Sequence, residues 1–322
     1  MELFFSIPLF IVALIILVKA SDYFVVSVAK IAKLFGISEF VIGMSIVAIG
    51  TSLPELITSL IAAGVGTTEF VVGNVVGSNI ANIGLILGLA ATIAVLHIKT
   101  RIYREDAAIL AVVTLMFFFF ALNGAISRFE GIILIVLFFA YLLYLFKFQQ
   151  LPKKEEKVIE KGGFKIKSKL NKATFKELAI SAVSLVFLIY AAKLVVQSAT
   201  DIATVLAVPV NVIAVTMIAL GTSLPELVVG ISALRKGMSE MLIGNIMGSN
   251  IMNILLIGGL SSVIKPLLVN SYSLLLTIPV MILLTALLMW FMRSQRNLVR
   301  WEGITLMTVY VLFIVAAWIF VF

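Results

Sequence analysis

The chain has 322 residues, of which 62% are hydrophobic and only 12% are charged. Soluble domains are about 45–50% apolar and about 25% charged, so this composition excludes a soluble enzyme, a nucleic-acid-binding module and a disordered scaffold. There is no cysteine and a single histidine, His97, which excludes a disulfide framework, a thiolate metal site and a histidine-built zinc or haem site. The net charge is +8, but the segment Lys147–Glu177 supplies +6 of it through ten lysines and four glutamates, so the excess reflects topology.

Ten apolar runs predict ten membrane-spanning helices, because about 20 apolar residues cross a bilayer. In chain order they lie at residues 4–34, 38–64, 69–96, 107–124, 129–147, 177–200, 205–234, 239–264, 271–292 and 302–322. Lysine and arginine concentrate in the odd-numbered connections between these runs. The positive-inside rule therefore predicts a multi-pass protein of the cell membrane with both termini outside and the odd connections in the cytoplasm. The expected fold class is an all-α integral membrane protein.

The lysine-rich segment at residues 148–176 divides the chain into two halves of five predicted helices, residues 1–147 and residues 177–322. We interpret it as a flexible cytoplasmic linker that fixes topology. A regulatory loop or a loop that binds lipid headgroups is the alternative, since clustered lysines next to a membrane attract anionic lipids.

The strongest feature of the sequence is an internal repeat. A shift of 171 residues aligns residues 41–89 with residues 212–260 without a gap, and 25 of the 49 aligned positions are identical. The shift spans five predicted crossings, an odd number, so the two copies enter the bilayer in opposite senses. Inverted repeats of this kind are typical of secondary transporters, whose substrate site lies at the bilayer midplane between the repeats.

The sequence GTSLPE occurs in the middle of one predicted crossing in each repeat. Pro54 lacks an amide proton and its ring clashes with the preceding turn, so the first of these helices should break near residues 49–53. Such a break should free backbone carbonyls from about Ala48 to Thr51 and leave the hydroxyls of Thr51 and Ser52 beside them. The second repeat carries the same arrangement 171 residues further on.

A second shared motif, GN-x-x-GSN-x-x-N, places polar side chains four residues apart, which puts them on one stripe of a helix. The stripe contains Asn74, Ser78 and Asn82 in the first repeat, and Asn245, Ser249 and Asn253 in the second. The glycine pairs Gly73/Gly77 and Gly244/Gly248 should let these helices approach their neighbours closely. Interhelical hydrogen bonding that only holds the bundle together explains the polar side chains equally well.

Glu55 and Glu226 are harder to explain as structural residues. A carboxylate at bilayer depth costs about 2.5–3.5 kcal/mol even on the lenient insertion scale, and no mid-span lysine or arginine lies in those helices to pair with either. A cation from solution is the remaining partner. A ligand set of carboxylates, amides, hydroxyls and carbonyls suits Ca²⁺ and Na⁺ rather than zinc, copper or iron.

Lys19, Asp22 and Lys193 are further charges within predicted crossings, and Lys193 lies at the repeat position of Asp22. A proton or ion relay is one interpretation. We favour an ion pair, or snorkelling of the long side chains near the end of a tilted helix.

With these motifs the sequence resembles the cation/Ca²⁺ exchanger superfamily, and most closely its prokaryotic Na⁺/Ca²⁺ exchangers. The two GTSLPE segments and the two GN-x-x-GSN-x-x-N segments look like the paired alpha-repeats of that family. The resemblance implies a core formed by the second, third, seventh and eighth helices, which holds a cluster of cation sites. It also implies that the first and sixth helices slide across this core and expose it to each side in turn.

The resemblance also implies ligands, position by position. Glu55 and Glu226 should be the central bidentate ligands, with oxygens from Thr51 and Thr222 around the Ca²⁺. The flanking Na⁺ sites should use Ser52, Ser78, Ser223 and Ser249 together with the carbonyls of Ala48 and Ala219, and the middle should be lined by Asn82 and Asn253.

Two departures refine this expectation. Asn253 stands where K⁺-dependent relatives and some archaeal exchangers carry an aspartate, which argues against K⁺ co-transport and leaves only two acids in the site. The proton-coupled branch usually carries an acid at the positions of Gly77 and Gly248, so these glycines favour the Na⁺/Ca²⁺ exchanger over the H⁺/Ca²⁺ exchanger.

The sequence therefore predicts an electrogenic Na⁺/Ca²⁺ antiporter rather than an enzyme, exporting Ca²⁺ with the inward Na⁺ gradient. Its expected partners are Ca²⁺, Na⁺ and the lipid bilayer, with no cofactor, no nucleic acid and no obligatory protein partner. An H⁺/Ca²⁺ exchanger, in which the two glutamates protonate instead of binding Na⁺, is the nearest alternative. A cation channel lined by the same oxygens is the second.

Overall fold

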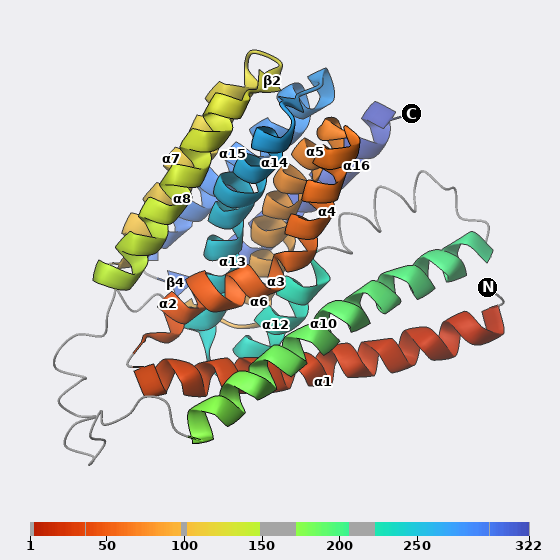
Figure 1. The fold of residues 1–322 in the computed structure, drawn as a ribbon, viewed down its shortest axis with the longest axis vertical. Helices are drawn as coiled ribbons and strands as arrows, with labels where there is room; N and C mark the ends of the chain where they lie inside the picture. Colours follow the sequence, from red (N-terminus) through yellow and green to blue (C-terminus); the bar gives the residue numbers. More distant parts are fainter. Residues whose placement is uncertain are drawn as a thin grey trace.

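The computed structural model describes residues 3–35, 37–97, 102–148, 172–205, 223–295 and 297–321. Seven of the described helices are long and apolar enough to cross a membrane, and a bent helix pair makes an eighth. Two further helices, α7 and α12, stand at the places of the remaining two predicted crossings. The predicted all-α membrane fold is confirmed, and the described helices are consistent with ten crossings in two inverted repeats of five. Figure 1 shows the helices packed into a bundle.

The first repeat begins with α1 (Leu3–Phe35). Its second crossing is bent and is formed by α2 (Glu39–Ile42), η1 (Gly43–Val47), α3 (Ala48–Thr51) and α4 (Leu53–Val65), and its third is formed by α5 (Thr68–Ile80), η2 (Ala81–Leu87) and α6 (Gly88–Ile93). The helices α7 (Ile102–Ala121) and α8 (Arg128–Phe148) complete it. The second repeat consists of α10 (Lys172–Val205), α12 (Leu224–Arg235), the crossing α13 (Ser239–Met252), η3 (Asn253–Gly258) and α14 (Gly259–Ile264), then η4 (Ser273–Thr277), α15 (Ile278–Gln295) and α16 (Arg300–Val321). The η segments are π-helical turns.

Two short antiparallel ladders join the repeats and were not predicted from the sequence. One pairs β1 (Leu96–His97) with β4 (Asn297–Leu298), and the other pairs β2 (Ala125–Ile126) with β3 (Leu267–Leu268). The strand β3 lies at the repeat position of β1, and β4 lies within one residue of the repeat position of β2. In Figure 1 the ladder of β2 and the strand β4 lie at opposite ends of the bundle, as an inverted repeat requires.

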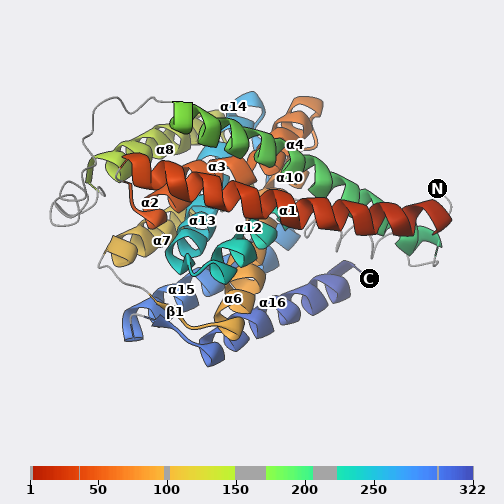
Figure 2. The same cartoon turned by 90° about the horizontal axis from the view of Figure 1, so that it is seen from below.

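The helices α1 and α10 lie side by side and cross the rest of the bundle at a steep angle (Figures 1 and 2). They are also the longest helices described, with 33 and 34 residues. The hydroxyl of Ser27 and the ammonium group of Lys30, both on α1, bond to the carboxylate of Glu177 on α10 at 3.0 and 2.9 Å. The two helices are thus connected to each other as a pair.

The crossings formed by α5–η2–α6 and α13–η3–α14 lie at the centre of the molecule. In their most apolar windows 78% and 94% of residues are buried, against 28–39% for the outer spans. Glycine allows α13 to reach this position. A Cβ atom at Gly248 would lie 2.5 Å from the carbonyl oxygen of Met44 in η1, and one at Gly244 would collide with the carbonyl of Phe40. The close approach predicted for this glycine pair is confirmed, whereas a Cβ atom at Gly73 or Gly77 would meet no described atom within 4 Å, so the approach predicted for that pair stays a prediction.

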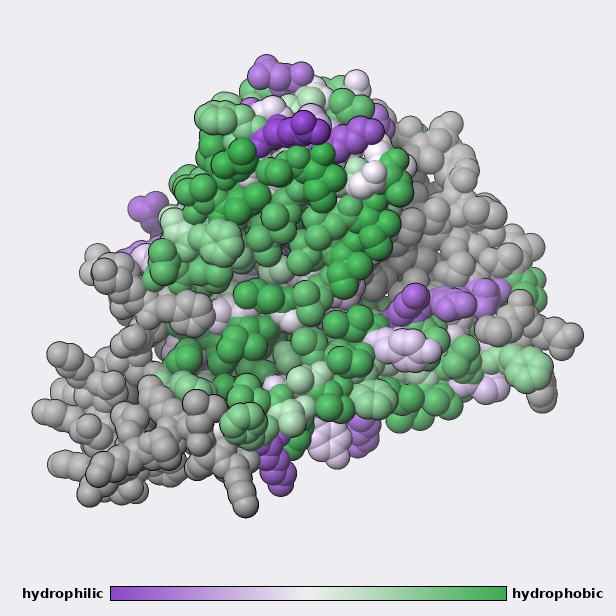
Figure 3. All heavy atoms as spheres, in the orientation of Figure 1, coloured by the Kyte–Doolittle hydropathy of each residue, from purple (hydrophilic) through white to green (hydrophobic). Residues whose placement is uncertain are grey.

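The surface agrees with a membrane environment. In Figure 3 hydrophobic side chains cover most of the described part of the visible face, and hydrophilic ones form small groups, several of them at its upper end and lower edge. Large apolar side chains on the outer helices are exposed, among them Phe119, Val136 and Leu312. Such a surface is stable in contact with lipid and not with water.

Candidate cation site

The predicted break in the first GTSLPE helix is present. The helix α3 ends at Thr51, α4 begins at Leu53, and the two parts of the crossing are bent by 47°. The expectation that the break frees the Ala48 carbonyl is wrong, because this oxygen still accepts a hydrogen bond from the Ser52 amide at 3.0 Å. Since Pro54 has no amide proton, Gly50 is the residue whose carbonyl loses its helical donor.

Ten of the twelve residues implied as ligands are described, and all ten are buried, with no more than 4% of any of them exposed. Ala48 and Thr51 lie in α3, Ser52 lies at the break, and Glu55 lies in the first turn of α4. Ser223 and Glu226 lie at the start of α12, Ser78 in α5, Asn82 in η2, Ser249 in α13 and Asn253 at the start of η3. Thr222 and Ala219 lie outside the described residues.

Contacts between the two repeats gather several of these side chains into one polar cluster. The hydroxyl of Ser52 donates to Glu226 Oε1 at 2.9 Å and lies 3.0 Å from the hydroxyl of Ser249. Thr51 Oγ1 lies 3.2 Å from Asn245 Oδ1 on the same stripe of α13. The break of the first repeat therefore faces both the carboxylate and the polar stripe of the second repeat.

The corresponding stripe of α5 faces α4. Asn74 donates its amide protons to the hydroxyl of Ser59 at 2.9 Å and to the backbone carbonyl of Glu55 at 3.4 Å. Asn74 is the residue equivalent to Asn245. Both asparagines therefore contact the second crossing of the first repeat: Asn245 contacts Thr51 before the break, and Asn74 contacts α4, which carries Glu55.

Asn82 and Asn253 bond to asparagines that the sequence analysis did not select. Asn82 Nδ2 donates to Asn250 Oδ1 at 3.0 Å, and Asn253 Nδ2 donates to Asn79 Oδ1 at 3.2 Å. Asn79 and Asn250 occupy equivalent positions in the two copies of the GSN motif, and this identity between the repeats could have marked them as candidates. The π-helical turns η2 and η3, where Asn82 and Asn253 lie, were also not predicted, although such turns are frequent at functional sites.

Several oxygens of the cluster have no hydrogen-bond donor among the described residues, although they are fully buried. They are Glu226 Oε2, Ser223 Oγ, Asn82 Oδ1 and Asn253 Oδ1. A buried polar group without a partner costs about 1–3 kcal/mol, which a cation bound between such oxygens would offset. Within the described ranges no three His, Cys, Asp or Glu side chains come together, so a cation bound in this cluster would be coordinated largely by neutral oxygens. This donor set suits Ca²⁺ and Na⁺.

Asp22 takes part in a separate polar contact. Its carboxylate accepts a 2.6 Å hydrogen bond from Ser232 and lies 3.0 Å from the ammonium group of Lys236, both at the end of α12. Asp22 is therefore in an ion pair, but with Lys236, which the sequence did not suggest, and not with Lys19 or Lys193, which are both exposed. The contact links α1 to α12.

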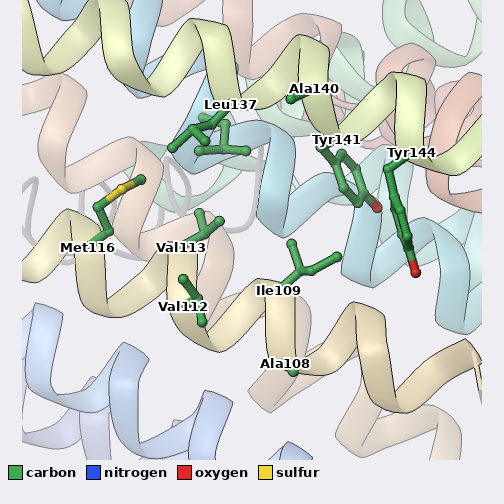
Figure 4. Close-up of a pocket in the computed structure, with 10 residues that line it drawn as sticks. Ala108, Ile109, Val112, Val113, Met116, Leu137, Ala140, Tyr141 and Tyr144 are labelled. Carbon is green, nitrogen blue, oxygen red and sulfur yellow. The ribbon is translucent and has the colours of Figure 1, made fainter.

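A cavity of about 380 Å³ lies between α7 and α8 and is also lined by Leu255 of η3, but no residue of the polar cluster lines it. Figure 4 shows Val112, Val113 and Met116 on one helix facing Leu137, Ala140 and Tyr141 on the other. Its lining is almost entirely apolar, so it offers a cation no coordination shell.

Inverted repeats, a broken central helix and a buried cluster of oxygens shared between the repeats define a secondary transporter, and the chain is not an enzyme. The comparisons give its family. The family model described as sodium/calcium exchanger protein matches residues 5–147 and 176–319. The chain belongs to the sodium/calcium exchanger family and is a multi-pass membrane protein.

Individual relatives agree with this assignment. The sodium/calcium exchanger MaX1 of Methanosarcina acetivorans is 38% identical, and the alignment covers 94% of this chain and 95% of that protein. An uncharacterized membrane protein of Methanocaldococcus jannaschii is 32% identical over 96% of this chain and 97% of its own. The structure of the sodium-calcium exchanger NCX_Mj soaked with zero Na⁺ and Ca²⁺ superposes with a TM-score of 0.85 and 29% identity, covering 98% of this chain and 100% of that one.

Proposed function

We propose that this chain, a Na⁺/Ca²⁺ antiporter that works by alternating access, binds its ions where the two repeats meet around Glu55 and Glu226. The contact between Ser52 and Glu226 carries the proposal, because it brings the break of one repeat to the carboxylate of the other at 2.9 Å in a fully buried place. Buried carboxylates in a membrane core require a charge partner. A transported cation meets this requirement.

The proposed ligands are the two glutamates with the oxygens of Thr51, Ser52, Ser78, Asn82, Ser223, Ser249 and Asn253 and the carbonyl of Ala48, together with Thr222 and Ala219. The Ala48 carbonyl retains a lone pair beside its helical hydrogen bond, so it can still contact an ion. One Ca²⁺ neutralises both carboxylates, and several Na⁺ ions do the same at neighbouring oxygens. Because the same oxygens serve both ions, Ca²⁺ and a full set of Na⁺ exclude each other, and this exclusion couples the two fluxes.

The paired helices α1 and α10 are the proposed moving element. They are bonded to each other through Glu177 and cross the bundle at a steep angle, beside the helices that hold the oxygens (Figure 2). Sliding of this pair across the core would open the site to one side and close it to the other. An ion-free site with two buried carboxylates should resist this movement, which prevents uncoupled leak.

The topology follows from the charge distribution. We place both termini outside, the repeats at residues 1–147 and 177–322, and the lysine-rich linker 148–176 in the cytoplasm of a cell that carries the protein in its cell membrane. The ranges matched by the family model support this division. Neither a cofactor nor an obligatory protein partner enters the proposal.

Flux of ⁴⁵Ca²⁺ into proteoliposomes, driven in turn by Na⁺, K⁺ and H⁺ gradients, tests the coupling. We expect saturable uptake that follows the Na⁺ gradient at fixed pH and responds to membrane potential. Uptake driven by a pH gradient alone would show instead the H⁺/Ca²⁺ exchanger, and flux that does not saturate and needs no counter-ion would show a channel.

A further inference from the structure

We propose that Asn79 and Asn250 are positioning residues that turn the carbonyl oxygens of Asn253 and Asn82 toward the transported ion. The inference rests on the proposed function of the cluster and extends it to two residues that have no place among the proposed ligands. Each of them accepts the amide proton of an asparagine in the opposite repeat, at 3.2 Å for Asn79 and 3.0 Å for Asn250.

The physical reason lies in the chemistry of the amide group. An asparagine side chain carries an acceptor oxygen and a donor nitrogen of almost the same shape, and only its hydrogen-bond partners decide which of the two faces a given direction. A cation requires the oxygen, and a flipped amide would present N–H groups to it. Since Asn79 and Asn250 take the N–H groups of Asn253 and Asn82, the two oxygens remain without a donor among the described residues.

The stripe of α13 that carries Asn253 faces the helix break of the first repeat. Ser249 contacts Ser52 at the helix break, and Asn253 follows Ser249 by one helical turn on the same stripe. Asn79 lies three residues before Asn82 in the α5–η2 crossing, and Asn250 lies three residues before Asn253 in the α13–η3 crossing, so each bonds to the asparagine of the other crossing. Each positioning residue thus accepts a hydrogen bond from the proposed ligand of the other repeat, so the two repeats orient each other's asparagines.

The two halves of this arrangement differ in one respect. Asn79 Nδ2 donates to the sulfur of Met281 on α15 at 3.5 Å, which holds the oxygen of Asn79 toward Asn253. At the repeat position of Met281 stands Leu110, which offers no acceptor, and Asn250 Nδ2 has no partner in the part of the chain that the structure describes. We therefore expect the stronger positioning effect at Asn79.

The test compares wild type with Asn79→Leu, Asn250→Leu, Asn253→Asp and the double variant Asn79→Leu/Asn253→Asp. Loss of a residue that orients a metal ligand typically lowers affinity ~10- to 100-fold, so Asn79→Leu should raise the half-saturating Ca²⁺ concentration by that factor while the maximal exchange rate changes little. The carboxylate introduced by Asn253→Asp has two equivalent oxygens and nothing to orient, so Asn79→Leu should have a much smaller effect in that background. Independence of the two effects would overturn the positioning role.

Thermal unfolding in detergent separates positioning from stability. The variant Asn79→Leu should lose most of the Ca²⁺-dependent rise in Tm, whereas a purely structural role would lower Tm equally with and without Ca²⁺. If Asn79→Leu does not fold, Asn250→Leu and its double variant with Asn82→Asp repeat the test in the other repeat.

The proposed site is checked in the same experiment. If Glu226→Gln leaves the Ca²⁺-dependent rise in Tm intact, the site itself is wrong. If Glu226→Gln abolishes it and Asn79→Leu leaves Ca²⁺ affinity unchanged, only the positioning role is wrong.

Discussion

The hydroxyl of Ser52 donates a 2.9 Å hydrogen bond to Glu226 Oε1, although the two residues lie 174 positions apart and in opposite repeats. A serine hydroxyl has one proton, so when Ser52 donates it to Glu226, the hydrogen bond between Ser52 and Ser249 at 3.0 Å is donated by Ser249. The bond to the carboxylate leaves the lone pairs of the Ser52 hydroxyl available to accept a proton or to contact a cation. This contact joins the helix break of the first repeat and the carboxylate of the second repeat in one polar cluster.

The first prediction concerns the two glutamates. Glu226→Gln and Glu55→Gln should each abolish Ca²⁺ transport. Removing the carboxylate from a buried pair of carboxylate and cation costs about 3–5 kcal/mol, and the single carboxylate that remains cannot neutralise a divalent ion. The measurement is Na⁺-driven ⁴⁵Ca²⁺ flux in proteoliposomes. Glu69→Gln, at an exposed glutamate in the first turn of α5, is the matched control and should transport normally. Wild-type flux in either buried variant would disprove the assignment.

The second prediction concerns the packing of α13. Gly248→Ala places a Cβ atom 2.5 Å from the carbonyl oxygen of Met44, a backbone atom that cannot move away by rotating a side chain. Overpacking of this kind costs about 1–3 kcal/mol, so Tm in detergent should fall and ion affinity should fall with it as α13 shifts. In Gly64→Ala the new Cβ meets no described atom within 4 Å, and its Tm should stay the same or rise. An unchanged Tm in Gly248→Ala would show that α13 does not lie as described.

The sequence predicted what depends on periodicity and duplication, and missed what depends on the exact crossing of helices. The run of apolar residues defines each crossing, Pro54 defines the break, and identity between the repeats marks both glutamates. The bonds from Asn253 to Asn79 and from Asn82 to Asn250 depend on where α5 and α13 cross, which no local pattern specifies. The ladders β1–β4 and β2–β3 are two residues long in each strand, too short for a detectable alternation.

The third prediction concerns the contact between α1 and α12. Asp22 and Lys236 are each more than a quarter exposed, so their ion pair contributes about 0.2–1 kcal/mol. Because it joins a proposed moving helix to the core, Asp22→Asn should shift the balance between the two access states by up to ~5-fold. The chain has no cysteine, so spin labels can be placed on α1 and α12 and their distance distribution measured directly. Lys30→Met breaks an ion pair within the α1–α10 pair and should leave that distribution unchanged. Equal effects of the two variants would contradict the idea.

The fourth prediction concerns the lysine-rich linker. Deleting residues 153–172 should leave ion selectivity intact, because every proposed ligand lies outside this segment. The same flux assay with Na⁺, K⁺ and H⁺ gradients checks this, with a glycine- and serine-rich replacement of equal length as the control. A change in ion preference would contradict the interpretation as a linker. A loss of rate only in liposomes with anionic lipids would favour the headgroup-binding alternative.

The last prediction concerns Asn253, whose amide can offer an oxygen to an ion but adds no charge. We expect transport by the wild type not to require K⁺, because Glu55 and Glu226 already balance Ca²⁺. Asn253→Asp would add a third carboxylate, and two like charges ~5 Å apart at an effective dielectric constant of about 20 repel by roughly 3 kcal/mol. A monovalent cation bound beside Ca²⁺ relieves this repulsion, so the variant should become responsive to K⁺. The measurement is Na⁺-driven ⁴⁵Ca²⁺ flux with and without K⁺ across pH 6 to 9, with Asn253→Ser as the control that removes the amide without adding charge. If wild type stops transporting when K⁺ is omitted, or Asn253→Ser responds to K⁺ as strongly as Asn253→Asp, the role assigned to Asn253 is wrong.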